Sequence, residues 1–202
     1  MSGSVSSEQF LYTSVHDPLA RPLFDGLEQE YDNRYADVRG RVGGSAREEL
    51  QRYPAEAFAS PVGAFVLLLR DGQAISGGAF MPHRDPHTAE FKRIWTLPGL
   101  RRQGIARRVL QELEEQAVRQ GYRRVFLTTG FRQPEAVALY LGHGYRALFD
   151  LHADPETIAH LPFEKPLPLQ QRGAVRRGSA EPCPASAPRG ATPAGPLHGG
   201  HA

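Results

Sequence analysis

Hydrophobic and polar positions change from a strand pattern to a helix pattern and back along the middle of the chain. Residues 89–97 combine aromatic and branched side chains and end at a Pro-Gly pair, which predicts a strand. Residues 104–120 repeat apolar side chains at helical intervals and stop at Gly121, which predicts an amphipathic helix. Residues 124–129 are mostly apolar and predict a second strand. A helix of this length between two strands predicts that the strands pair in parallel.

The same patterns predict further elements on both sides of this unit. In chain order they are helices at 23–38 and 46–58, hairpin strands at 63–69 and 73–81, a helix at 134–141, and strands at 145–151 and 163–167. The hairpin is indicated by its Asp71-Gly72 turn. Pro134 suits the first turn of the last helix, and the closing strands are expected to complete the sheet.

Composition indicates one folded domain with weakly structured ends. The chain has 202 residues, of which 40% are hydrophobic, so it can bury a sizeable core. Residues 9–167 are expected to form the domain, and residues 1–8 a flexible N-terminus. Residues 168–202 are rich in Pro, Gly, Ala and Arg and contain few large apolar side chains, which predicts a disordered tail.

Charge and cysteine content exclude several classes of function. A formal net charge of +2, without any nucleic-acid motif, argues against nucleic-acid binding. The longest apolar run, residues 64–69, is too short to span a bilayer, and the first residues lack a secretory signal, so we expect a cytoplasmic protein without a membrane partner. The single cysteine, Cys183, excludes an internal disulfide, and no Cys or His spacing indicates a metal site.

The junction between the first expected strand and the helix after it has the character of an anion site. The first N–H groups of a helix lack partners and attract anions, Gly104 allows a close approach, and Arg101 and Arg102 add positive charge. The Walker pattern and the dinucleotide-binding pattern are both missing. Residues 101–106, Arg-Arg-Gln-Gly-Ile-Ala, instead resemble the pyrophosphate loop of the GCN5-related N-acetyltransferases (GNATs).

A second segment strengthens this resemblance. Residues 134–145 place a small residue, a Leu-Tyr pair and a Gly-Tyr pair at the intervals of the second GNAT signature. The resemblance implies an α/β fold with a mixed, mostly antiparallel central sheet, a splayed parallel pair of strands, and helices on both faces. Many GNATs carry an Asn near the start of this helix, where residues 132–135 read Arg-Gln-Pro-Glu. The group that contacts the pantetheine arm is therefore left open.

The resemblance also implies a chemistry, the transfer of an acetyl group from acetyl-CoA to a primary amine by direct attack. Alkyl amines are mostly protonated near neutral pH, so a base is needed, and Glu90 lies about where some GNATs carry theirs. The alternative is a surface Glu that faces Lys92 or Arg93. Tyr140 is expected to protonate the leaving thiolate, unless it is an ordinary core tyrosine. The implied contacts of acetyl-CoA are Ile94, Trp95, Thr96, Arg101, Arg102, Gln103, Gly104, Ile105, Ala106 and Arg107.

The acceptor amine is the least defined part of the interpretation. Tyr31, Arg34 and Tyr35 occupy neighbouring positions on the first expected helix and are predicted to line the acceptor pocket. Arg34 could bind a substrate carboxylate, and an arginine on a solvated helix face is the alternative. We expect a small-molecule amine as acceptor and no metal. A catalytically idle acyl-CoA-binding module, a protein N-terminal or lysine acetyltransferase, and a homodimeric state are left open.

Overall fold

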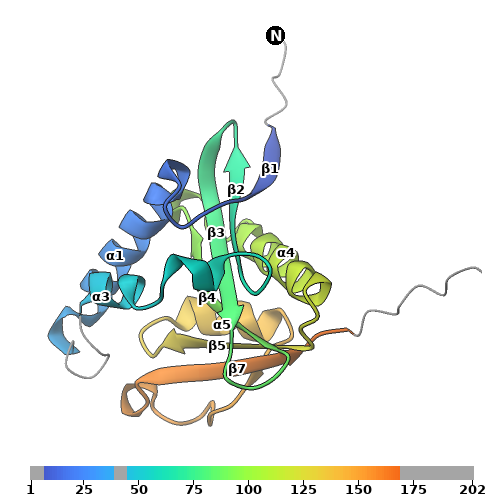
Figure 1. Cartoon of the computed structure of the whole chain (residues 1–202). Coiled ribbons are helices and arrows are strands. Elements are labelled where there is room, and N and C mark those ends of the chain that lie inside the picture. Colours follow the sequence, from blue (N-terminus) through green and yellow to red (C-terminus); the bar gives the residue numbers. More distant parts are fainter. Residues whose placement is uncertain (1–6, 39–44, 169–202) are drawn as a thin grey trace, which may run out of the picture. The chain divides into compact units, whose positions relative to one another are not determined.

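Seven strands form the central sheet of the computed structural model, which describes residues 7–38 and 45–168. The strands are β1 (Glu8–Tyr12), β2 (Ala64–Arg70), β3 (Gln73–Pro82), β4 (Thr88–Thr96), β5 (Arg124–Gly130), β6 (Arg146–Ala147) and β7 (His160–Pro166). Their order across the sheet is β1-β2-β3-β4-β5-β7-β6 (Figure 1). β4 and β5 pair in parallel, and the other neighbours pair antiparallel. The structure thus confirms the mixed, mostly antiparallel sheet.

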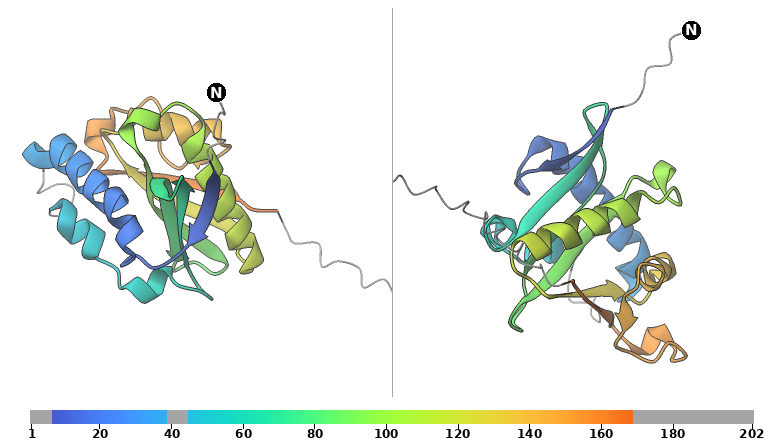
Figure 2. Two further views of the ribbon diagram at one scale, coloured as in Figure 1. Left: turned by 90° about the horizontal axis from the view of Figure 1, so that it is seen from above. Right: turned by 90° about the vertical axis from the view of Figure 1, so that its right-hand side faces the viewer.

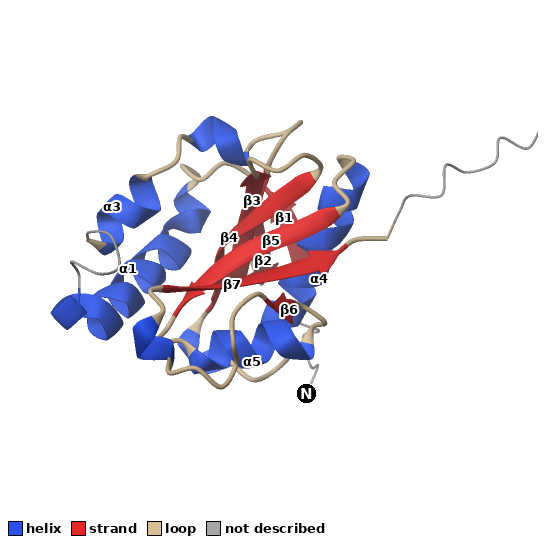
Figure 3. Cartoon of the chain, turned by 90° about the horizontal axis from the view of Figure 1, so that it is seen from below, coloured by secondary structure: helices blue, strands red, loops and turns tan. Residues whose placement is uncertain are grey.

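Helices cover both faces of this sheet, as predicted. They are α1 (Arg21–Tyr35), α3 (Ala46–Gln51), α4 (Ile105–Arg119) and α5 (Pro134–Gly142), with 3₁₀ turns η1 (Pro18–Ala20), η2 (Ala36–Val38), η3 (Ala55–Phe58), η4 (Pro98–Leu100) and η5 (Pro155–Thr157). α1 and α3 lie on one face, and α4 lies across the other (Figure 2). The view from below shows α5 on the same side as α4 (Figure 3).

Two hydrophobic cores follow from this arrangement, and β2 belongs to both. Val66 and Leu68 pack in the core beneath α4 and α5, whereas Phe65 and Leu67 pack in the core beneath α1 and α3. A strand covered on both faces needs apolar residues at every position, which explains the unbroken apolar run of β2. The run that was too short for a membrane span is therefore a central strand.

Four predictions differ from the structure at the edges of elements. The helix expected at 46–58 is interrupted after Gln51, because Pro54 lacks an N–H group and disfavours helical backbone in the residue before it. β1 was not predicted, and Glu8, which was assigned to a flexible N-terminus, is its first residue. The closing strand at 145–151 is reduced to β6, and β7 begins earlier than expected. Residues 169–202, including Cys183, lie outside the described residues.

The parallel pair separates partway along β4. β4 pairs with β5 from Thr88 to Phe91, and no pairing with β5 continues beyond that residue in the described chain. At the same place, the register between β3 and β4 shifts, and Arg93 adopts a left-handed backbone with φ of 60°. This is a β-bulge, which bends a strand and redirects its side chains. The bulge and the separation confirm the splayed pair, and they open a space between the two strands.

Candidate active site

A cavity of about 900 Å³ lies at the separation of β4 and β5. Its wall contains residues from α1, α3, β4, β5 and α5 and from the segment that begins α4. We use the term α1–α3 wall for the part formed by the cavity-lining residues of these two helices, by Arg52 directly after α3, and by Lys92 and Arg93 of β4. A cavity of this size can hold a small molecule beside part of a larger ligand.

Most of the predicted site residues line this cavity. They are Tyr31, Arg34, Tyr35, Ile94, Trp95, Thr96, Arg101, Arg102, Gly104, Ile105, Ala106, Arg107 and Tyr140. Gln103 and Glu90 are not part of the wall. The structure therefore brings most of the predicted residues together at one cavity, and their roles stay predictions.

The start of α4 has the geometry of an anion site. Gly104 precedes the first turn with φ of 77°, and no side chain caps the helix. A Cβ atom placed on Gly104 would meet no atom within 4 Å, so the space beside this backbone is open. The unpaired N–H groups of the first turn and the helix dipole favour an anion in that space. This end of the cavity can hold a phosphate group.

Two of the predicted arginines form ion pairs with protein carboxylates. Arg101 Nη2 lies 2.6 Å from Glu30 Oε2, and Arg101 Nε donates to the carbonyl oxygen of Thr96 at 3.2 Å. Arg34 Nη2 lies 3.1 Å from the other oxygen of Glu30 and also pairs with Glu135. Arg34 is thus bound to protein groups on α1 and α5. The predicted role of Arg34 in binding a substrate carboxylate stays a prediction, and a substrate would have to share this arginine with Glu30 and Glu135.

Tyr140 faces the cavity from α5 with only 6% of its surface exposed. Burial raises the pKa of its hydroxyl above the ordinary tyrosine value, and the nearby Tyr31 raises it further. The ring of Tyr140 is held against Tyr145 and Phe163. A phenol that is fixed in place and protonated at neutral pH can donate a proton or a hydrogen bond to a group in the cavity.

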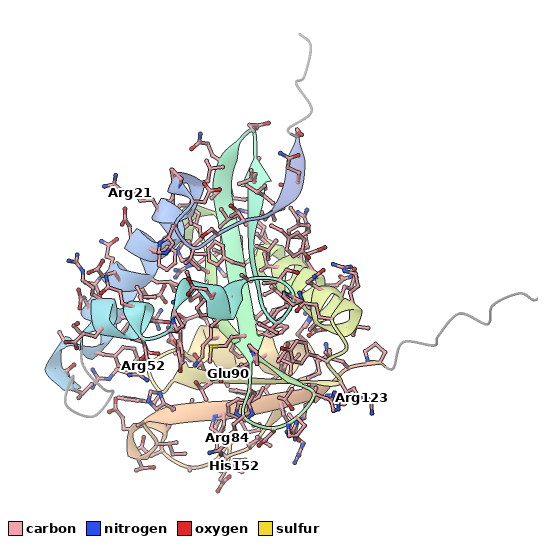
Figure 4. All side chains as sticks on the ribbon, in the orientation of Figure 1. Arg21, Arg52, Arg84, Glu90, Arg123 and His152 are labelled. Atoms are coloured by element: carbon pink, nitrogen blue, oxygen red, sulfur yellow. The ribbon has the colours of Figure 1, made fainter. Side chains whose placement is uncertain are left out.

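Glu90 is engaged with a neighbouring residue on its own strand. Its Oε1 atom lies 2.7 Å from Lys92 Nζ, and the Lys92 ammonium stacks over the ring of Tyr53. Figure 4 shows Glu90 on the sheet and Arg52 at the end of α3. The pairing with Lys92 matches the alternative for Glu90, except that both side chains are mostly buried rather than on the surface, and the role of Glu90 as a base stays a prediction.

Sequence reasoning missed the carboxylates that do line the cavity. These are Glu30, Asp32, Glu49 and Glu135. Glu49 lies in α3, where its Oε2 atom is 2.7 Å from Arg52 Nη2. Its charge also contributes to raising the pKa of Tyr31, after the larger effect of burial. The start of α3 at Ala46 was predicted correctly, and the capping box formed by Ser45 and Glu48 accounts for it, but no local pattern reveals that α3 lies beside β4.

Gln133 occupies the region where many GNATs carry an asparagine. Its Oε1 atom accepts hydrogen bonds from the Thr129 hydroxyl at 2.6 Å and from the Gly130 N–H at 3.2 Å. Gln133 lines the cavity, and its side-chain amide nitrogen makes no hydrogen bond to the described residues. The amide group is therefore the candidate for the contact that the sequence left open.

Residues 7–38 and 45–168 contain no cluster of three or more His, Cys, Asp or Glu residues that could hold a metal ion. Within the same residues, no helix is both long and apolar enough to cross a membrane.

Known proteins resemble this chain in sequence and in structure. It is 32% identical to IAA acetyltransferase from Azospirillum brasilense over 135 residues, which are 59% of this chain and 87% of that protein. The PaiA N-acetyltransferase of Thermoplasma acidophilum, solved in complex with coenzyme A, is similar with a TM-score of 0.58 and 16% identity over 79% of this chain and 99% of that chain. The ribosomal-protein-S18-alanine N-acetyltransferase from Escherichia coli is similar with a TM-score of 0.54 and 13% identity over 83% of this chain and 99% of that chain. The model of the acetyltransferase (GNAT) family matches residues 24–145, which include the splayed strands, the anion site and Tyr140, and the chain therefore belongs to this family of acyl-CoA-dependent acyltransferases.

Proposed function

We propose that the protein transfers an acetyl group from acetyl-CoA to a primary amine of a small molecule. The observation that carries this proposal is one cavity with an anion site at the start of α4 and a buried, protonated Tyr140 in its wall. The relative from Thermoplasma acidophilum is in complex with coenzyme A.

The residues present fit acetyl-CoA, which would supply the acetyl group as a thioester when bound. The N–H groups that follow Gly104 would hold its pyrophosphate, with positive charge from Arg102 and Arg107 nearby in the wall. The edge of β4 beyond Phe91 has no partner on β5, so its backbone groups are available to an extended chain and to a developing oxyanion. Gln133 would donate its amide N–H to the pantetheine arm.

Two proton transfers are assigned to protein groups. The protonated acceptor amine must lose one proton before its nitrogen attacks the acetyl carbon, the nitrogen loses a second proton to solvent as the amide forms, and the sulfur must gain one as the carbon–sulfur bond breaks. The Tyr140 hydroxyl is proposed to give its proton to that sulfur. A carboxylate, acting directly or through a water molecule, is proposed to receive the proton of the amine.

Glu90 and Glu49 are the two candidates for this carboxylate. Glu90 was predicted from its distance to Arg101 along the sequence, but it lies outside the cavity wall and is paired with Lys92. Glu49 is also ion-paired, with Arg52, but it lines the cavity, and this position favours it over Glu90. The variants Glu49→Gln and Glu90→Gln separate them, because only replacement of the residue that accepts the proton should lower kcat strongly while the dissociation constant of acetyl-CoA stays unchanged.

The test of the function combines calorimetric titration of acetyl-CoA with measurement of thiol release in the presence of amines. The panel contains small amines and short peptides with a free N-terminus, because the relative from Escherichia coli is named for a protein alanine. Acetyl-CoA binding followed by thiol release with small amines supports the proposal. Binding without turnover would indicate an acyl-CoA-binding module, turnover of peptides alone would indicate a protein acetyltransferase, and no binding would refute all of these functions.

A further inference from the structure

Arg93 is a cationic group in the α1–α3 wall that has no carboxylate partner. Among the described residues, no carboxylate oxygen lies within ion-pair distance of its guanidinium group, and Glu49 acts on it only through space. Its Nη2 atom donates to the backbone carbonyl of Leu50 at 2.6 Å. Its Nη1 atom is shielded from solvent and has no hydrogen-bond partner. A buried charge without a counter-ion is costly, which makes its position informative.

The guanidinium group is held in a defined position. Its Cζ atom lies 4.1 Å from the ring centroid of Phe58 and 5.2 Å from that of Phe24. Burial lowers the pKa of Arg93 to about 10, so the group is still charged at neutral pH. Stacking on two rings orients the planar guanidinium without neutralising its charge.

The backbone of Arg93 is also unusual. A φ of 60° is rarely adopted by residues other than glycine, and such strain is concentrated at functional sites. The bulge places Arg93 on the same face of β4 as Lys92, since Lys92 stacks on Tyr53 and Arg93 on Phe58, and both rings belong to the core beneath α1 and α3. A regular strand would point these consecutive side chains to opposite faces.

The other cations of this wall are paired with carboxylates of the protein. Arg34 pairs with Glu30 and Glu135, Arg52 pairs with Glu49, and Lys92 pairs with Glu90. An anionic ligand that enters the cavity beside α3 would therefore find its uncompensated partner in Arg93.

We propose that the acceptor is a primary amine that also carries a carboxylate, and that Arg93 determines this specificity by pairing with the carboxylate. The proposal rests on the proposed function and narrows its substrate class. The carboxylate would be bound out of water, where a charge-assisted hydrogen bond is strong. In this proposal Arg93 has the role that was predicted for Arg34.

The experiment compares L-amino acids with the corresponding L-amino acid amides as acceptors. The amide keeps the amine and the side chain but removes the negative charge. For each pair, the ratio of kcat/KM values is measured in the wild-type protein and in Arg93→Met. Because the same two compounds are used with both proteins, their different amine basicities cancel when the two ratios are compared. Arg47→Met is the matched control, since Arg47 is an exposed arginine of α3 that pairs with Glu28 and does not line the cavity.

The wild-type protein and the control are expected to favour the carboxylate form, and Arg93→Met is expected to reduce this preference about 10- to 100-fold, the usual effect of one charged hydrogen bond. Arg93→Lys keeps the positive charge and should retain part of the preference for the carboxylate form. If Arg93→Met does not fold, the same comparison is made with Arg93→Lys. The dissociation constant of acetyl-CoA should be the same in all four proteins.

Three results would overturn the inference. If Arg93→Met lowers kcat/KM equally for the amino acid and for its amide, Arg93 has a structural role. If the wild-type protein acetylates both forms equally well, the protein does not recognise the carboxylate, although the proposed function stands. If acetyl-CoA binds but no amine is acetylated, the function itself fails. In that case, each amino acid and its amide are titrated by calorimetry into the protein bound to coenzyme A, which measures carboxylate recognition without turnover. Equal dissociation constants for acid and amide would refute recognition of the carboxylate.

Discussion

Replacing Gly104 by alanine is expected to weaken acetyl-CoA binding through a single added methyl group. Gly104 has φ of 77°, and its Cβ position has no neighbour within 4 Å. Gly72, in the turn between β2 and β3, has φ of 78° and an equally open Cβ position. Gly72→Ala is therefore a matched control, because it introduces the same backbone strain at a place that does not line the cavity.

The expected losses of stability and affinity follow from the similar backbone conformations of Gly104 and Gly72. An L-residue in a left-handed conformation costs about 1 to 2 kcal/mol, and 1 kcal/mol lowers the melting temperature of a domain of this size by about 2 to 4 °C. Both variants should lose this amount of stability. At Gly104 the methyl group would also occupy the space beside the first N–H groups of α4. Loss of one charged hydrogen bond, about 1.5 to 3 kcal/mol, corresponds to an affinity about 10- to 150-fold weaker.

Thermal unfolding and calorimetric titration of acetyl-CoA, both on the same protein preparations, test this reasoning. The expected result is a similar fall in melting temperature for the two variants and a weaker acetyl-CoA complex for Gly104→Ala alone. If both variants bind acetyl-CoA like the wild-type protein, the start of α4 does not hold the cofactor. If both lose affinity equally, the loss reflects stability rather than contact.

Three further predictions concern the acid, the fold and the cavity wall. Tyr140→Phe should lower kcat about 100-fold without changing the shape of the pH profile between about pH 6 and 9, because burial raises the pKa of this hydroxyl and keeps it protonated; a lost alkaline limb in steady-state assays would contradict this. Glu8→Gln should lower the free energy of unfolding by about 0.5 to 1 kcal/mol at pH 7. Hydrogen bonds from arginines of α4 and β2 hold the pKa of Glu8 below its ordinary value, so this stability is present above the ordinary carboxylate pKa and is lost as pH falls through the lowered one; in urea titrations the difference between the two proteins should shrink as pH falls below the ordinary carboxylate pKa. Gly130→Ala should raise the acceptor KM and lower the melting temperature, because the new Cβ would overlap the Tyr35 hydroxyl, and an unchanged KM would place that tyrosine outside acceptor binding.

The part of the fold that was predicted well is the part whose signals are local. The strand and helix around Gly104 and the strand that follows were located to within a residue or two, since helical periodicity and glycine or proline at the ends act within each segment. β1 was missed because its five residues carry no strong pattern, and its position depends on pairing with β2 more than fifty residues later. Pro54 shows the opposite case, because a local signal for the end of α3 was present and was not used.

In the candidate site, too, features that depend on consecutive residues could be predicted, and contacts between distant segments could not. The uncapped helix start at Gly104, where we place the anion, could be predicted because it consists of consecutive backbone groups at the start of one helix. The partners of its side chains could not, because Arg101 meets a carboxylate 71 residues earlier in the chain, and both Glu30 and Arg34 take part in the same network. Only the packing of α1 against β4 brings these groups together, and no spacing along the sequence encodes that contact.

The bulge in β4 explains why the charge pattern of this strand was the hardest to interpret. Strict alternation would place Arg93 beside Phe91, beneath α4, where a guanidinium group would be buried among apolar side chains. The left-handed backbone at Arg93 avoids this and restores the alternation afterwards, so that Ile94 packs beneath α4 and Trp95 beneath α1. Two consecutive cations thereby share one face, and the single carboxylate of the strand, Glu90, neutralises only Lys92. The irregularity at the point where β4 separates from β5 therefore also leaves one positive charge in the cavity wall without a carboxylate partner, and our proposals for cofactor binding and for acceptor selection both depend on this one bulge.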